Sequence, residues 1–219
     1  MGGVGTPPGI SPTFWSLLLS EPLRDTTVLD VGTGTGRLAL ALAPLCKYVL
    51  GVDRERDAID EARRRADGAG VSNASFVVAD ADAVDYRSLP PEVPRLVTAH
   101  LFLSDALIER SARVLPTGGV LAVVGFHVDQ WKETGRVSRF AYDEDRMRQL
   151  LDTHGFVVEH LAVEREVQRF GSVEEALAAA IGLQERWKSD GRWVRYIKFL
   201  EDGGRTLTRS HLIVKARRP

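Results

Sequence analysis

The chain has 219 residues, of which 44% are hydrophobic and 27% are charged. A chain of this length can bury a core of its own, and a single cysteine excludes a disulfide framework or a cysteine zinc site. The net charge of -1 provides no overall field that would attract nucleic acid or an anionic membrane. No apolar run approaches the roughly 20 residues of a membrane-spanning helix and no secretory signal is visible, so the sequence predicts a cytoplasmic protein.

A serine followed by a proline predicts the first helix. Ser11 would cap this helix and Pro12 would occupy its first turn. We expect residues 1–26 to form a tail and this helix. The apolar segment Pro7 to Leu19 would either pack on a sheet or fold over a ligand site.

From Thr27 onward, segments typical of buried strands alternate with segments that have helical spacing. The expected strands are 27–31, 48–52, 74–79, 95–99 and 120–125, and the expected helices are 36–45, 55–67 and 103–115. Repeated strand–helix–strand units predict a parallel sheet that is covered by helices.

The last third of the chain departs from this alternation. A helix is expected over 143–154 and a strand over 156–163, and a capping box formed by Ser172 and Glu175 precedes two helical patterns. A closing strand is expected from Thr206 to Ala216. These patterns predict one domain over 27–219, with a helical insertion at about 166–204.

A glycine-rich loop joins the first of these strands to the next helix in the sequence "VLDVGTGTGRLALALA". It lacks the G-x-G-x-x-G spacing of a dinucleotide site, because Arg37 stands where the third glycine should be. It also lacks the terminal Gly-Lys-Ser or Gly-Lys-Thr of a P-loop. Bare backbone beside the Asp30 carboxylate indicates a ligand that carries positive charge.

Four segments in this order resemble the motifs of the class I S-adenosylmethionine-dependent methyltransferases. They are "VLDVGTGTG", "VLGVDRE", "FVVADADAV" and "ARVLPTGGVLAVVG", and they cover Val28 to Gly125. The resemblance implies a Rossmann-like, doubly wound α/β fold. Its seven-stranded sheet would be mostly parallel, with the last strand antiparallel.

The resemblance also implies which residues bind S-adenosylmethionine. The loop that follows the first strand would approach the methionine part of the cofactor through Asp30, Gly32, Thr33, Gly34 and Gly36. No metal is expected.

Two later motifs would hold the nucleoside. Asp53, which closes the second strand, would accept hydrogen bonds from both ribose hydroxyls, and the Arg54 guanidinium would stack on the adenine. Asp80 would bind the adenine amine, and the backbone amide of Ala81 would bind a ring nitrogen. Both acids follow strands, so they would meet the loop at one edge of the sheet.

The implied reaction is methyl transfer to a nucleophile, and we expect a small-molecule acceptor, for which an acidic molecule is one candidate. The chain has "TAHLFLSD" where DNA amino-methylating enzymes carry Asn/Asp-Pro-Pro-Tyr/Phe. A nucleic-acid (RNA) methyltransferase is the alternative, because "ERWKSDGRWVRYIKF" mixes aromatic and basic residues. A cofactor-binding protein without catalysis is the third interpretation.

Two of the five histidines are candidate bases. His100 follows the fourth strand and His127 follows the fifth, and open parallel sheets bind ligands at these strand ends. His127 is preferred, since His100 would also contact the cofactor. The alternatives are that His100 only packs near the cofactor and that His127 caps a loop. His154, His160 and His211 have ordinary structural explanations.

Overall fold

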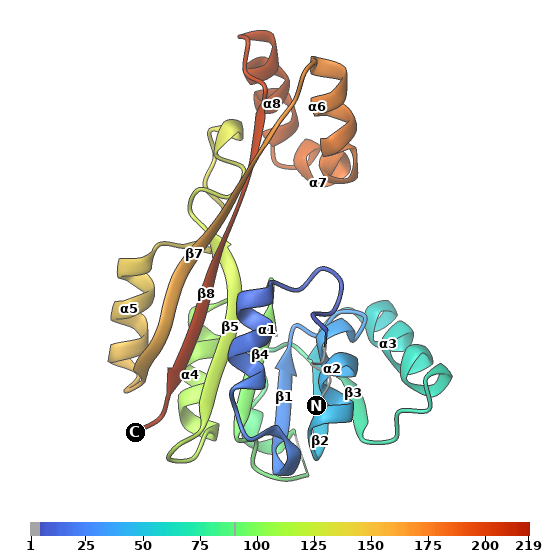
Figure 1. Ribbon diagram of the computed structural model, residues 1–219, viewed down its shortest axis with the longest axis vertical. Coiled ribbons are helices and arrows are strands. Elements are labelled where there is room, and N and C mark those ends of the chain that lie inside the picture. The colour runs from blue at the N-terminus through green and yellow to red at the C-terminus, as the bar shows by residue number, and fades with distance from the viewer. Residues whose placement is uncertain (1–4, 90) are drawn as a thin grey trace. The chain divides into compact units, whose positions relative to one another are not determined.

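The computed structural model describes residues 5–89 and 91–219 (Figure 1), so the first four residues of the predicted tail lie outside the described residues. Backbone contacts divide the chain into two compact units. Unit 1 comprises Met1–Gly125, Glu144–Ala162 and Ile213–Pro219, and unit 2 comprises Phe126–Asp143 and Val163–Leu212. That residues 27–219 form one domain stays a prediction.

The sheet has the predicted topology. Its strands are β1 (Thr27–Val31), β2 (Tyr48–Asp53), β3 (Ala74–Val78), β4 (Leu96–His100), β5 (Val120–His127), β7 (Val157–Arg169) and β8 (Thr206–Arg217). They lie in the order β3-β2-β1-β4-β5-β8-β7, and the short β6 (Ala141–Tyr142) pairs with β5. The five strands from β3 to β5 are parallel, whereas β8 runs opposite to β5 (Figure 1). The Rossmann-like fold is therefore confirmed.

The register of the central strands places the ends of β1, β2 and β4 at one edge. Asp30 of β1 lies opposite Gly51 on one side and Thr98 on the other. Each strand ends one or two residues after these positions, so the loops that follow β1, β2 and β4 leave the sheet together. This edge is where open parallel sheets hold their ligands.

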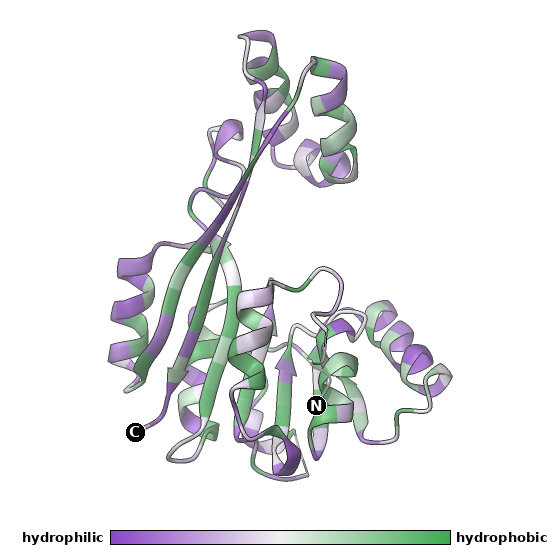
Figure 2. Cartoon of the chain, viewed as in Figure 1, coloured by the Kyte–Doolittle hydropathy of each residue, from purple (hydrophilic) through white to green (hydrophobic). Residues whose placement is uncertain are grey.

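Helices cover both faces of the sheet in unit 1. The helices α1 (Pro12–Leu19), α2 (Arg37–Leu42) and α3 (Arg56–Gly68) contribute fully buried side chains such as Phe14 and Ile59 to one core cluster with β1. The helices α4 (Asp105–Val114) and α5 (Glu144–Thr153) lie on the opposite face. The chain moves from β1 toward β2 and β3 at one side of the sheet, and from β4 toward β5 at the other. Because both kinds of crossover are right-handed, this reversal of direction places their helices on opposite faces. Figure 2 shows the hydrophobic residues gathered along the strands between these layers.

Two predicted elements end more than two residues away from their position in the structure, whereas His100 and His127, predicted to follow their strands, are the last residues of β4 and β5. Helix α2 ends at Leu42 and continues as a 3₁₀ turn over Ala43–Leu45, because Pro44 has no backbone N–H to extend an α-helix. Strand β7 continues to Arg169 instead of stopping near Val163. The successive charged residues past Val163 conceal the strand, because this part of β7 has little burial on either face and so lacks an alternation of apolar and polar residues.

Unit 2 contains the outer parts of β7 and β8 and the helices α6 (Val173–Ala180), α7 (Gln184–Lys188) and α8 (Arg192–Glu201). Its core is aromatic: the Trp187 ring lies 5.3 Å from that of Trp131 and 5.5 Å from that of Tyr196. Trp131 holds a left-handed backbone (φ 57°), and its N–H donates to Thr208 O at 2.9 Å. The helices of unit 2 therefore have a core of their own.

A cluster of ion pairs in unit 1 joins the segment after α1 to the end of the chain. Glu21 pairs with Lys215 and, at 2.7 Å, with Arg217, while Glu159 contacts the same two cations. The side chains of Glu21 and Lys215 are only 10% and 8% exposed. Burial by itself raises the pKa of Glu21, but hydrogen bonds from Arg217 and Lys215 outweigh it and hold the pKa below its usual range.

We expect Glu21→Gln to lower the free energy of unfolding by about 1–3 kcal/mol, because it leaves Lys215 buried with one fewer anionic partner. Since the folded-state pKa of Glu21 lies below its unfolded value, this stabilisation is complete above the unfolded pKa. It is lost as the pH falls through the folded pKa.

Urea unfolding at neutral pH and under acidic conditions measures both effects. The control is Glu92→Gln, which removes an exposed pair with Lys47 and should cost about 0–1 kcal/mol. Equal losses in the two variants would contradict the prediction.

Candidate cofactor site

The glycine loop is tied to the end of β2 by its backbone. The N–H groups of Gly32 and Thr33 donate to Val52 O at 2.8 and 3.0 Å. Gly32, Gly34 and Gly36 have left-handed φ values of 67°, 53° and 78°. Such values disfavour any residue with a β-carbon, so the spacing of the glycines follows from the backbone path of the loop.

The three glycines differ in what surrounds them. A β-carbon at Gly32 would lie 2.6 Å from Phe102 Cβ, and one at Gly36 would lie 3.0 Å from the Phe76 ring. These two glycines are therefore needed for close packing. A β-carbon at Gly34 would meet nothing within 4 Å. Gly34 consequently presents bare backbone to open space, where a ligand can approach.

Asp53 lies against this loop. Its Oδ2 accepts a hydrogen bond from Gly34 N at 2.8 Å, and its Oδ1 accepts one from Glu55 N at 3.0 Å. A carboxylate has about four acceptor positions, so these two bonds orient the group and leave capacity for two hydroxyls. This arrangement fits the ribose role that the sequence predicts for Asp53.

The loop after β3 reaches the same edge. Ala79 N donates to Asp53 O at 2.9 Å, which places Asp80 next to the end of β2. Asp80 Oδ1 accepts from Asp82 N at 2.9 Å, so the acid is held in a turn, and Ala81 beside it is buried. The structure thus brings Asp53, Asp80 and Ala81 together, as a nucleoside site requires.

Asp30 is buried beneath the glycine loop. The Thr33 hydroxyl donates to its Oδ2 at 2.6 Å, whereas its Oδ1 is buried without a hydrogen-bond partner among the described residues. Burial raises the pKa of Asp30 to about 7, although the bond from Thr33 opposes this shift. A buried carboxylate oxygen that lacks a donor fits a cofactor with a positively charged methionine end.

The other two residues predicted near the cofactor lie at the same edge. His100 is the last residue of β4, and its ring lies 5.9 Å from the Phe14 ring of α1. The Arg54 side chain is 75% exposed and pairs with Glu55 at 3.1 Å. Arg54 is therefore at the surface next to Asp53 in the chain, and its stacking on adenine stays a prediction.

His127 belongs to unit 2, where its side chain is buried. Its Nδ1 accepts a hydrogen bond from Asp129 N at 3.2 Å and lies 3.1 Å from Ser210 Oγ. A ring nitrogen that accepts from an amide carries no proton, so Nδ1 is the acceptor in the bond from Asp129 N. This arrangement favours a structural role, and the role of His127 as a base stays a prediction.

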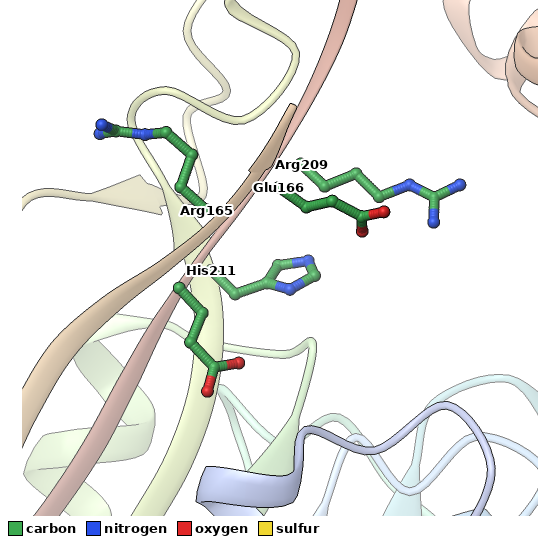
Figure 3. Close-up of a pocket in the computed structure, with 5 residues that line it drawn as sticks. Arg165, Glu166, Arg209 and His211 are labelled. Carbon is green, nitrogen blue, oxygen red and sulfur yellow. The ribbon is translucent and has the colours of Figure 1, made fainter. Parts of the chain in front are cut away.

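One hollow of unit 2 was not predicted from the sequence. It has a volume of about 330 Å³ and is lined by Glu164, Arg165, Glu166, Arg209 and His211 (Figure 3). The sequence assigned His211 to a strand with an ordinary structural role. The available signal was a run of three charged residues at 164–166 of β7, together with Arg209 and His211 at alternate positions of β8.

The described residues contain no group of His, Cys, Asp or Glu side chains suited to a metal ion. Within the same residues, no helix has the length and apolar character needed to cross a membrane.

We expect Gly34→Ala to weaken binding of S-adenosylhomocysteine at least about tenfold, because the new methyl group would occupy the open space beside the loop. The matched control is Gly70→Ala. Gly70 also has a positive φ (64°) and open surroundings, but it lies in the turn after α3. Both variants should lose similar stability from backbone strain, and calorimetry should show weaker binding only for Gly34→Ala. Equal affinities would refute this role of the loop.

We expect Asp53→Ala also to weaken S-adenosylhomocysteine binding about tenfold or more, since it removes a charged acceptor worth about 1.5–3 kcal/mol. Asp67→Asn, at the exposed end of α3, serves as the control in the same titration. Undiminished binding by Asp53→Ala, with the fold intact by circular dichroism, would exclude a ribose contact.

Comparison with known proteins agrees with this geometry. A family model described as a methyltransferase domain matches residues 23–188. Protein-L-isoaspartate O-methyltransferase of Dictyoglomus turgidum is 32% identical over 124 residues, which are 53% of this chain and 56% of that protein. The chain thus spans about half the length of this curated relative.

Solved structures share the fold over almost the whole chain. A proposed methyltransferase from Bacillus halodurans C-125 superposes with a TM-score of 0.69 and 24% identity, covering 95% of this chain and all of that one. Phosphoethanolamine N-methyltransferase 2 of Haemonchus contortus superposes with a TM-score of 0.62 and 17% identity, covering 98% of this chain and 54% of that one. The glycine loop, the acids at the strand ends and the strand order agree with the matching family model. The chain therefore belongs to the class I S-adenosylmethionine-dependent methyltransferases and uses S-adenosylmethionine as its methyl donor.

Proposed function

We propose that this methyltransferase acts on a small-molecule acceptor that carries an anionic group. The observation that carries the proposal is the position of the N-terminal segment in unit 1, which covers the edge of the sheet beside the glycine loop. The aromatic core of unit 2 supports it independently.

The N-terminal segment is anchored at two points. Arg37 at the start of α2 donates to Gly9 O at 3.4 Å, and Ile10 is buried in the core cluster that includes residues of α2. Farther along, Phe14 contacts the ring of His100 at the end of β4. The chain's own residues therefore lie over the ends of β1 and β4. A covered edge admits a small acceptor more readily than a base within a polymer.

The aromatic residues that suggested RNA binding face inward. Trp187 and Tyr196 are fully buried, and Trp193 is 9% exposed. Buried rings cannot stack on nucleic-acid bases, which removes the main argument for an RNA acceptor. The cations of α8 differ among themselves: Arg192 is buried and paired with Asp190, whereas Arg195 and Lys198 are exposed. Exposed cations would attract an RNA phosphate as well as an acidic small molecule, so the argument against RNA rests on the buried rings.

Methyl transfer in such a site depends chiefly on alignment. The sulfonium of the cofactor is already a good leaving group, so the protein must orient the acceptor and exclude water. A base is required only if the acceptor has to lose a proton, and His100 and His127 stay the candidates for that role.

The test measures where a radioactive methyl group goes. Purified protein is incubated with methyl-labelled S-adenosylmethionine and, separately, with a desalted metabolite extract, total RNA and a protein extract. We expect label in the low-molecular-mass fraction only. Gly34→Ala serves as the control for transfer that does not depend on the bound cofactor. Transfer of label to RNA or to protein would refute the proposal.

A further inference from the structure

The loop after β3, in unit 1, carries two of the residues predicted to hold the nucleoside. Asp80 is exposed, so hydrogen bonds and not packing orient it. Asp80 Oδ1 accepts from Asp82 N at 2.9 Å, and Asp80 O accepts from Ala83 N at 3.0 Å and from Val84 N at 2.9 Å. The direction of the Asp80 carboxylate therefore depends on where this turn, residues 80–84, is placed.

One side chain of helix α4 holds the turn at two places. The Nη1 of Arg110 donates to Val84 O at 2.8 Å, and its Nη2 donates to Asp82 O at 2.7 Å. A planar guanidinium that donates to two carbonyls fixes both the position and the tilt of the turn, which the single ammonium of a lysine does less well. Arg110 therefore acts on the turn through its backbone.

The start of α4 adds a third attachment. Ser104, the N-cap residue of this helix, accepts from Leu107 N at 3.0 Å and donates to Asp82 Oδ1 at 2.5 Å. Leu107 and Ile108 are fully buried, so α4 is itself fixed on the sheet. The middle and the end of the turn are thus attached to a rigid element.

The surroundings of Arg110 indicate that the two carbonyls determine its position. Its Nε is buried and has no hydrogen-bond partner among the described residues, which costs free energy. The Tyr86 hydroxyl, just after the turn, is also buried without a partner within those residues. Burial raises the pKa of Tyr86, and Asp82 and Asp80 add to this effect, whereas Arg110 opposes it. These groups therefore lie close together, yet Arg110 bonds to the turn and the Tyr86 hydroxyl does not.

We propose that Arg110 is a positioning residue for the nucleoside end of the cofactor. It holds the turn so that the Asp80 carboxylate and the Ala81 amide face the adenine edge before the cofactor binds. A preorganised turn gives higher affinity than a mobile one, because binding then requires no ordering of the chain. The inference concerns residues of unit 1 alone, and it does not depend on which acceptor the protein methylates.

The experiment compares two ligands that differ at one edge of the base. S-adenosylhomocysteine offers an amine that can donate to Asp80 and a ring nitrogen that can accept from the Ala81 amide. S-inosylhomocysteine has an oxygen in place of the amine and a proton on that nitrogen, so it mismatches both groups. We expect the wild-type protein to bind the adenosyl ligand about tenfold or more tightly by calorimetry.

Arg110→Met removes both bonds to the turn and keeps the apolar stem of the side chain. We expect it to weaken binding of S-adenosylhomocysteine about tenfold, and to reduce the preference for this ligand over S-inosylhomocysteine to about threefold or less. Arg110→Lys, which can reach one carbonyl, should give intermediate values. A loss of stability alone would not change the preference, since both ligands bind the same folded protein.

Two variants serve as matched controls. Arg113→Met removes an exposed pair with Glu109 on the same helix, and Tyr86→Phe removes a hydroxyl that has no partner among the described residues. Both should keep the affinity and the preference within about twofold of the wild-type values.

Three results would overturn the inference: no preference between the two ligands in the wild-type protein, a full preference retained by Arg110→Met, or an equal collapse in either control. If Arg110→Met does not fold, the preference of Arg110→Lys decides the test. These titrations contain no acceptor, so the proposed function stands or fails separately, on whether label from S-adenosylmethionine enters a small molecule or a macromolecule.

Discussion

The hydrogen bonds between the glycine loop and the end of β2 are the constraint on which the site depends. Gly32 and Thr33 donate to the carbonyl of Val52, and Gly34 donates to the carboxylate of Asp53. These bonds continue the pairing of β1 with β2 beyond the last residue of β1. The loop therefore cannot shift without disturbing the sheet. The bond from Gly34 also orients Asp53, so the backbone amides of the loop and the Asp53 carboxylate are fixed in one frame before any ligand binds.

Much of this arrangement could be predicted from the sequence because it follows from strand order. A run such as Val120 to Gly125, apolar at every position, must be buried on both faces, and alternating strands and helices then require a parallel sheet. In such a sheet, acids that follow strands meet at one edge. Asp53 and Asp80 are joined there through the Ala79 amide, as their positions after β2 and β3 indicated.

The parts that could not be predicted depend on partners far away in the sequence. The amide of Asp129 is close to His127 along the chain, but Ser210, which also contacts its Nδ1, lies 83 positions away. No local pattern reveals that contact. Similarly, His211 has the same strand context as Leu212, and only the positions of Thr208 and Ser210 against the segment after β5 show which face His211 occupies. Burial is also missing as a signal where β7 carries charges on successive residues.

The N-terminal segment is held in place by residues near the other end of the chain. Its first part contacts α2, because Gly9 O accepts a hydrogen bond from Arg37 and Ile10 is buried in the core cluster that includes residues of α2. Its last part, after α1, is held by Glu21 to Lys215 and Arg217 of β8. Lys215 also donates to the hydroxyl of Ser20 at 2.9 Å. Because α1 is fixed at both ends, its buried side chains Phe14 and Trp15 keep their place on the sheet. The position of α1 on the sheet therefore depends on the last strand of the chain as much as on the helix itself.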